Sequence, residues 1–152
     1  MRARYLPAEI FTAFAGVDLI LHAGDIMDWT VIRELSTLAP VEAVYGNMDG
    51  AEVRQRLERR RIIELGEVRI GLIHGDGAGY GTVARAAQAF SGVHCIVFGH
   101  SHRPYNEWHG DTLLFNPGSP TDRRMMPMGS YGFLYVSGDY IWGDICYMEP
   151  RI

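Results

Sequence analysis

Two patterns of apolar residues alternate along the first two thirds of the chain. Short, mostly apolar runs predict buried strands, and segments in which apolar residues recur three or four positions apart predict helices that pack by one face. The predicted strands lie at 17–21, 41–45, 61–65, 68–73 and 95–98, and the predicted helices at 7–16, 28–39, 51–60 and 82–90. Alternation of strand and helix is typical of parallel βαβ units.

The last third of the chain carries hairpin patterns instead. Short strands flank polar turns in two places, 105–108 with 112–115, and 131–136 with 140–147. These hairpins predict a second, antiparallel sheet packed against the first, with Trp108 and Trp142 in its core or at its edge. The sequence therefore predicts one α/β domain over residues 1–152, with two packed mixed β-sheets flanked by helices.

Composition and charge narrow the possible partners. Of the 152 residues, 47% are hydrophobic and 21% charged, as in a globular domain. No apolar run approaches the roughly 18 residues of a membrane span, so no membrane partner is expected. A net charge of −4 makes nucleic acid an unlikely partner, and the arginines between 54 and 61 are interpreted as the solvated face of a helix. Cys95 and Cys146 lie in apolar runs and are interpreted as free thiols of a cytoplasmic protein.

Chemistry-bearing side chains follow the predicted strands. They are Asp25, Asn47, His74, His100 and His102. A glycine lies next to each of these turns and allows close backbone approach, and the carboxyl ends of strands are where open α/β sheets bind ligands. Imidazoles and side-chain oxygens are ligands for divalent transition metals. Four unrelated turns could each hold such residues, but their common place at strand ends favours a metal site.

The same residues occur in an ordered set of motifs. These are Gly24-Asp25, Gly46-Asn47-x-Asp49, His74-Gly75 and Gly99-His100-Ser101-His102. The set resembles the calcineurin-like metallophosphoesterase family, and the segment at 115–119 resembles its small single-domain bacterial and archaeal phosphodiesterase branch. The resemblance implies that Asp25 bridges two divalent metal ions, that Asn47, His74 and His100 complete one position, and that His102 belongs to the other. It also implies that Asn47 and His74 take part in catalysis.

The implied activity is metal-dependent hydrolysis of a small phosphodiester. The mixed nitrogen and oxygen ligands suit manganese, iron, zinc or nickel, and two such ions can clamp a phosphoryl group and activate water. A histidine often follows the asparagine in related phosphomonoesterase-type sites. Here Met48 stands there and cannot donate a proton, so an aryl ester is the expected good substrate. The alternative is a non-catalytic metal-binding interaction module on the same fold, as in a retromer scaffold subunit.

The chain departs from the family at its start. The family begins with an apolar strand ending in Asp-x-His, and this sequence has no such strand. Either the sequence is truncated at its N-terminus relative to the family, which we favour, or the chain has lost one metal position. We therefore expect a single domain with one metal position holding only Asp25 and His102. The absent strand also predicts an apolar groove in the core.

Several other residues keep two interpretations. Arg123 and Arg124 either contact a substrate phosphate or lie in a solvated loop, and Asp49 either orients a ligand histidine or caps the third helix. His22 either orients Asp25 or is a partly buried strand-end histidine. A homo-oligomer is also possible. A β-lactamase-like metal site is excluded because Arg103 interrupts the histidine cluster that it needs.

Overall fold

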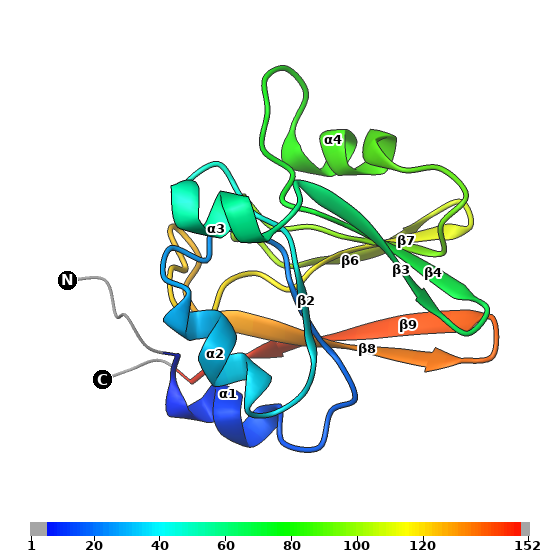
Figure 1. Cartoon of the computed structure of the whole chain (residues 1–152). Coiled ribbons are helices and arrows are strands. Elements are labelled where there is room, and N and C mark those ends of the chain that lie inside the picture. The colour runs from blue at the N-terminus through cyan, green and yellow to red at the C-terminus, as the bar shows by residue number, and fades with distance from the viewer. Residues whose placement is uncertain (1–5, 150–152) are drawn as a thin grey trace.

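The computed structural model describes residues 6–149, which form four layers (Figure 1). The helices are α1 (Ala8–Ala13), α2 (Thr30–Ser36), α3 (Ala51–Arg56) and α4 (Thr82–Ala89). The strands are β1 (Ile20–His22), β2 (Val41–Ala43), β3 (Arg60–Leu65), β4 (Val68–Ile73), β5 (Cys95–Val97), β6 (Tyr105–His109), β7 (Thr112–Asn116), β8 (Ser130–Ser137) and β9 (Tyr140–Tyr147). The predicted α/β class is therefore confirmed.

The largest sheet has five strands in the order β3-β4-β5-β7-β6. Its three central strands run parallel, and β3 and β6 are antiparallel at the edges. The hairpin of β6 and β7 therefore joins this sheet, and our prediction that it belongs to a second sheet was wrong. Leu113, Leu114 and Phe115 are all buried, which suits a central strand covered on both faces better than a strand of a one-sided sheet.

The remaining strands form two separate pairs, so the prediction that β1 and β2 belong to the first sheet was wrong. β1 pairs in parallel with β2, and β8 pairs in antiparallel fashion with β9. Within residues 6–149, no backbone ladder joins β1 to β8. Instead, both strands line one cavity of about 1210 Å³. Many of its other wall residues are apolar side chains of α1 and of the five-stranded sheet, such as Phe14, Ile70 and Val97. This cavity agrees with the apolar groove expected from the sequence.

The core lies mainly between the strand layers. Buried side chains of the five-stranded sheet, including Leu72, Val97 and Phe115, pack with Leu21 of β1 and Leu134 of β8. On the outer face of the large sheet, Ala86 and Phe90 of the α4 region pack on Ile96 and Leu114. On the other side of the molecule, α1 and α2 pack on β1, and α2 and α3 pack on β2. The carboxyl ends of the strands are thereby held at one edge.

Helix ends follow local chemistry, although the helices are shorter than predicted. Pro7 lies just before α1 rather than in its first turn. The Oδ1 atom of Asp28 accepts the backbone N–H of Thr30 at 2.9 Å, which stabilises the start of α2. None of the helices within residues 6–149 has both the length and the apolar character that crossing a bilayer requires.

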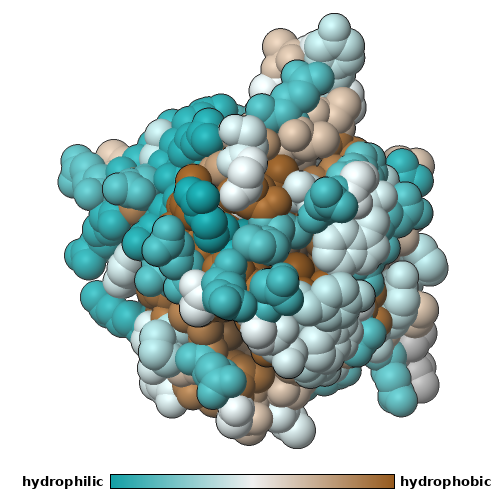
Figure 2. All heavy atoms as spheres, turned by 90° about the vertical axis from the view of Figure 1, so that its right-hand side faces the viewer, coloured by the Kyte–Doolittle hydropathy of each residue, from teal (hydrophilic) through white to brown (hydrophobic). Residues whose placement is uncertain are grey.

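The aromatic side chains of the last hairpins lie outside the core. Trp108 is 45% exposed and Trp142 40% exposed, so of the two predicted places the core is wrong, and both lie on edge strands. In β9 the outward position of Trp142 follows the buried Ile141, whereas β6 has no buried residue. Figure 2 shows the side of the molecule to which the hairpin turns point. Most of it is polar or weakly hydrophobic, and strongly hydrophobic atoms appear in limited patches.

Candidate metal centre

Four loops that follow strands meet at one edge of the molecule. Asp25 lies after β1, Asn47 after β2, His74 directly after β4, and His100 after β5. His74 is only 2% exposed, whereas the other three are more accessible. The parallel direction of these strands places their carboxyl ends together, as the sequence predicts.

Four of the five candidate ligands are in direct contact. The Nε2 atom of His74 lies 3.2 Å from Asp25 Oδ2, 3.0 Å from Asn47 Oδ1 and 3.2 Å from His100 Nδ1. The rings of His74 and His100 meet edge to face, with centroids 5.1 Å apart. The structure thus brings together the four side chains that the family resemblance assigns to one metal position. Their role as ligands stays a prediction.

The hydrogen bonds of His74 show what this group of atoms requires. Its Nδ1 lies 2.7 Å from the carbonyl oxygen of Ala23, which can only accept, so Nδ1 carries the ring hydrogen of the neutral imidazole. The Nε2 atom then presents its lone pair to Asp25 Oδ2 and Asn47 Oδ1, which also carry lone pairs. Only a cation among these atoms, a proton or a metal ion, turns repulsion into attraction.

A divalent transition metal fits this set of donors. Imidazole nitrogen, carboxylate oxygen and amide oxygen together suit manganese, iron, zinc or nickel. Two ligands about 2.1 Å from one ion and at right angles to each other lie about 3.0 Å apart, close to the separations around His74 Nε2. The Ala23 carbonyl also fixes the tautomer of His74 that leaves Nε2 available, as partners of metal-bound histidines do.

The electrostatics favour the metal-binding forms of Asp25 and His100, whereas a proton competes for His74. Burial opposes ionisation of Asp25, but hydrogen bonds from His74 and from the backbone N–H of Met48 outweigh it and lower the pKa of Asp25. Burial also opposes the charge of His74, but the bonds to Asp25 and to the Ala23 carbonyl outweigh it and raise the pKa of His74. Burial and the neighbouring cations His74 and Arg124 lower the pKa of His100. Asp25 is thus ionised and His100 neutral near pH 7.

His102 stands apart from this group. It lines the same cavity as Asp25, and its Nδ1 donates to the backbone carbonyl of Asp122, which leaves Nε2 available for a ligand. Among residues 6–149, no three histidine, cysteine, aspartate or glutamate side chains are arranged as a ready-made metal site. Within residues 6–149, His102 makes no hydrogen bond to the other four candidates, and its place in a second metal position stays a prediction.

The family of the chain follows from comparison with known proteins. The calcineurin-like phosphoesterase superfamily domain matches residues 2–139. The chain belongs to this superfamily. A probable metallophosphoesterase of Methanothermobacter thermautotrophicus is 42% identical over 129 residues, which cover 82% of this chain and 73% of that protein. A phosphodiesterase of Methanocaldococcus jannaschii is 28% identical over 122 residues, which cover 72% of this chain and 71% of that protein.

Solved structures show the same fold. Vps29 from Entamoeba histolytica, in a complex with Zn²⁺, superimposes with a TM-score of 0.76 over 93% of this chain and 89% of that chain. The two sequences are 22% identical, so this likeness concerns the fold alone. The names of the sequence relatives agree with the metal-dependent chemistry that the residues around His74 indicate.

In this phosphoesterase domain, strained backbone is concentrated around the candidate site. Asp25, His100 and His102 have φ values of 56°, 64° and 59°, in the left-handed region that side chains other than glycine rarely adopt. Met27 and Arg124, in neighbouring loops, also have positive φ. Such conformations raise the energy of the folded state by about 1–3 kcal/mol each and are found mainly at functional sites.

Two glycines allow the loops to approach each other. A Cβ atom on Gly24 would lie 2.8 Å from the backbone nitrogen of Gly46, and a Cβ on Gly46 would lie 2.3 Å from Asp25 Oδ1. Neither position has room for a side chain, because backbone atoms and the His74 ring lie within 3.0 Å of both. The predicted need for close backbone approach is thus confirmed at these two glycines.

Two buried polar side chains that the sequence did not identify as supports hold the ligand loops. Asp49 accepts the backbone N–H groups of Met27 and Gly46, both at 2.8 Å, and so joins the loops of Asp25 and Asn47. These two bonds give Asp49 a role that differs from both predicted ones, which were to orient a ligand histidine or to cap the third helix. Asn116 donates to the Gly99 carbonyl at 3.0 Å and to Ser101 Oγ at 3.2 Å, and so supports the loop that carries His100 and His102.

Some of the remaining candidate residues line the cavity of the candidate site and others do not. Arg124 lines the cavity of the candidate site, whereas Arg123 donates to the Pro127 carbonyl at 2.5 Å. Met48 also lines the cavity and is 50% exposed. His22 accepts the backbone N–H of Gly24 at 3.2 Å through Nδ1, so it supports the turn before Asp25 rather than contacting the carboxylate.

Proposed function

We propose that this protein is a metal-dependent phosphodiesterase that acts on small phosphodiesters with a dinuclear metal centre. The observation that carries the proposal is the convergence of Asp25 Oδ2, Asn47 Oδ1 and His100 Nδ1 on the lone pair of His74 Nε2. Lone pairs this close together are stabilised by a cation placed among them. Membership of the calcineurin-like phosphoesterase superfamily supports hydrolysis of a phosphoester as its purpose.

In this proposal, the four side chains in contact hold one ion, and Asp25 shares a second ion with His102. Two such ions, when bound, neutralise charge on a phosphoryl group and lower the pKa of water. Asp25 suits the bridging role because its two oxygens have different neighbours, Met48 N–H on Oδ1 and His74 on Oδ2. The Asp122 carbonyl keeps His102 in the tautomer whose Nε2 can bind. Manganese, iron, zinc and nickel all fit these donors.

The chain's own residues also favour a class of substrate. Arg124 brings a guanidinium to the cavity wall, where it can bind an anionic phosphoryl oxygen. Met48 occupies the wall next to Asn47 and can make apolar contact with a substrate but cannot donate a proton to a leaving group. Phosphodiesters with aryl leaving groups, which need little protonation, are therefore the proposed good substrates.

Hydrolysis of bis(4-nitrophenyl) phosphate tests this function. The protein is treated with a chelator, dialysed and assayed with added Mn²⁺, Zn²⁺ or Ni²⁺. We expect turnover that depends on the metal and falls at least 100-fold in Asp25→Asn and in His74→Ala, because each change removes a donor of the cluster. His109→Ala is the matched control, since that histidine lies on β6 and bonds Tyr105. Metal binding without turnover under all three metals would favour the non-catalytic interaction module.

A further inference from the structure

A row of aromatic side chains covers the outer face of the hairpin strands. Trp108 of β6, Tyr140 and Trp142 of β9, and Tyr135 of β8 follow one another with ring centroids 6.2, 5.8 and 5.4 Å apart. Neighbouring ring planes are inclined by only 22°, 29° and 20°. The four rings are 40–55% exposed. We call these four residues the aromatic ladder.

The ladder continues a face that is covered elsewhere. Tyr131 and Phe133 occupy the preceding outward positions of β8, and Phe14 of α1 packs on both, with centroids 5.8 and 5.7 Å away. The hydrophobic cluster around α1 and α2 includes Tyr131 but none of the four ladder residues. Exposed aromatic surface of this extent is typical of interaction sites.

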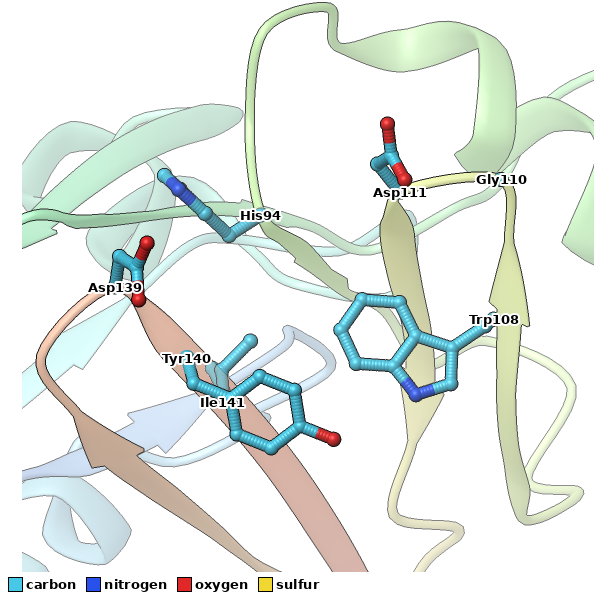
Figure 3. Close-up of a pocket in the computed structure, with 7 residues that line it drawn as sticks. All are labelled: His94, Trp108, Gly110, Asp111, Asp139, Tyr140 and Ile141. Carbon is cyan, nitrogen blue, oxygen red and sulfur yellow. The ribbon is translucent and has the colours of Figure 1, made fainter.

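A small pocket lies at the end of the ladder. It has a volume of about 290 Å³, and its walls include Trp108, Tyr140, His94, Asp111 and Asp139. In Figure 3 the rings of Trp108 and Tyr140 lie side by side with their faces turned the same way, and Asp111 and Asp139 stand on the two turns that border the space. Pockets for drug-sized ligands usually measure about 300–1,000 Å³. This pocket suits a single side chain better than a whole metabolite.

The walls of the pocket include two carboxylates and no lysine or arginine. Arg69, whose backbone bonds to His94, holds its guanidinium 3.8 Å from Glu64. The chain contains no lysine, and no arginine occurs between positions 104 and 122 or between 125 and 149. Asp111 and Asp139 make no ion pair with any residue in the described part of the chain. A ligand for this surface must therefore bring the positive charge itself.

We propose that the aromatic ladder, with Asp111 and Asp139, is a docking surface for a partner protein that inserts an arginine side chain into this pocket. A guanidinium is planar and stacks on aromatic faces, and it can bind carboxylates through two parallel N–H donors. Stacking on aromatic faces suits the rings of Trp108 and Tyr140, and the paired donors suit the carboxylates of Asp111 and Asp139 at the border of the pocket. The charge complementarity favours such a partner over nucleic acid, whose phosphates the two carboxylates would repel.

The docking surface is separate from the candidate metal centre. His94 precedes β5 and borders the pocket, whereas His100 follows the same strand and contacts His74. The two sites therefore lie at opposite ends of β5, and the docking proposal does not depend on the proposed phosphodiesterase activity. Substitutions in the pocket should leave metal-dependent turnover unchanged, which also shows that such variants are folded.

Tryptophan fluorescence gives a direct test. The Trp29→Phe variant keeps only Trp108 and Trp142, so its emission reports on the ladder. We expect a saturable change, in the millimolar range, with a capped pentapeptide that has arginine at its centre and glycine elsewhere. The same peptide with citrulline, which is uncharged and of similar shape, should bind at least roughly tenfold more weakly. Indole N–H signals in the NMR spectrum of the unaltered chain provide the same measurement without a substitution.

Matched charge variants sharpen the result. Asp111→Asn with Asp139→Asn should weaken binding of the arginine peptide about tenfold or more. Glu52→Gln with Glu67→Gln removes the same charge from α3 and from the β3–β4 turn and should not weaken it. Equal binding of the arginine and citrulline peptides would overturn the proposal, as would a response to a neutral oligosaccharide such as cellotetraose instead. Concentration-dependent dimers that disappear in the Asp111 and Asp139 variant would show that the occupant is a second copy of this chain rather than another protein.

Discussion

At the scale of single residues, His74 is the side chain that contacts the three other clustered candidate ligands. Its ring is held by the carbonyl oxygen of Ala23, and its second nitrogen faces oxygens that cannot donate to it. The pKa of His74 is raised, because the bonds to Asp25 and to the Ala23 carbonyl outweigh the effect of burial. A proton and a metal ion thus compete for the same position, and metal binding should release protons.

The two positions of the proposed metal centre should respond differently to loss of a ligand. Asp25→Ala should lower the metal bound per chain more than His102→Ala, because Asp25 contacts the cluster around His74 as well as serving the position of His102. Elemental analysis after dialysis against Zn²⁺ measures this. Equal metal content in the unaltered chain and in Asp25→Ala would contradict the assignment.

His22 should make the fold sensitive to mild acid. Burial lowers the pKa of His22 to about 4, against roughly 6.5 in an unfolded chain. As the pH falls from 6.5 to 4, the unfolded state binds a proton that the folded state does not, so stability is lost in this window. His22→Asn keeps an oxygen acceptor for the Gly24 N–H and cannot titrate.

Urea unfolding with a chelator present, at pH 7.5 and at pH 5, tests this effect. The unaltered chain should lose about 2 kcal/mol more free energy of unfolding between the two pH values than His22→Asn. The same loss in both proteins would show that another group is responsible.

Much of the site was accessible from the sequence at this scale, but its supports were not. Asp25, Asn47, His74 and His100 could be identified because each is a ligand type placed after an apolar run. His74 and His102 donate to the backbone carbonyls of Ala23 and Asp122. Such bonds cannot be predicted from the identity of side chains. Asn116 lies in the segment at 115–119 that carries part of the family resemblance, but only the fold shows that it holds the loop of His100.

At the scale of elements, the loop between β7 and β8 carries two adjacent arginines, one of which can serve as the control for the other. Arg124 lines the cavity, and the neighbouring Arg123 bonds the Pro127 carbonyl. Arg124→Ala should raise the KM for an aryl phosphodiester by roughly tenfold with a smaller effect on kcat, because a charged hydrogen bond to phosphate is lost. Arg123→Ala should leave both constants near those of the unaltered protein. Steady-state kinetics of the two variants decide between the arginines.

Element types could be predicted well, because periodicity is local. The hairpin of β3 and β4 and the position of α4 are as expected. The sheet that each hairpin joins was not predictable, since β7 pairs with β5 through residues far away in sequence. Whether Trp108 lies in the core or at an edge could not be decided from the sequence, because hydrophobic character alone does not tell which face of a strand is covered.

At the scale of the whole molecule, the cavity between β1 and β8 divides the fold into parts of unequal stability. The central strands β4, β5 and β7 are paired on both sides, whereas β1 has one partner and only three residues. Hydrogen exchange should therefore be at least about tenfold faster for the amides of β1 than for those of β5. Mass spectrometry of exchange in the chelated protein measures the difference. Equal protection of the two strands would show that the layers unfold as one unit.

The left-handed backbone of Asp25, His100 and His102 has a consequence for attempts to make this protein more heat-resistant. Glycine or asparagine adopts such φ values more readily, so replacements at these positions relax the chain. Selection for thermostability alone would therefore accumulate changes where the proposed metal ligands stand. A variant selected only for survival on heating should be more stable to heat but should retain fewer metal ions. This is the usual trade-off between stability and activity.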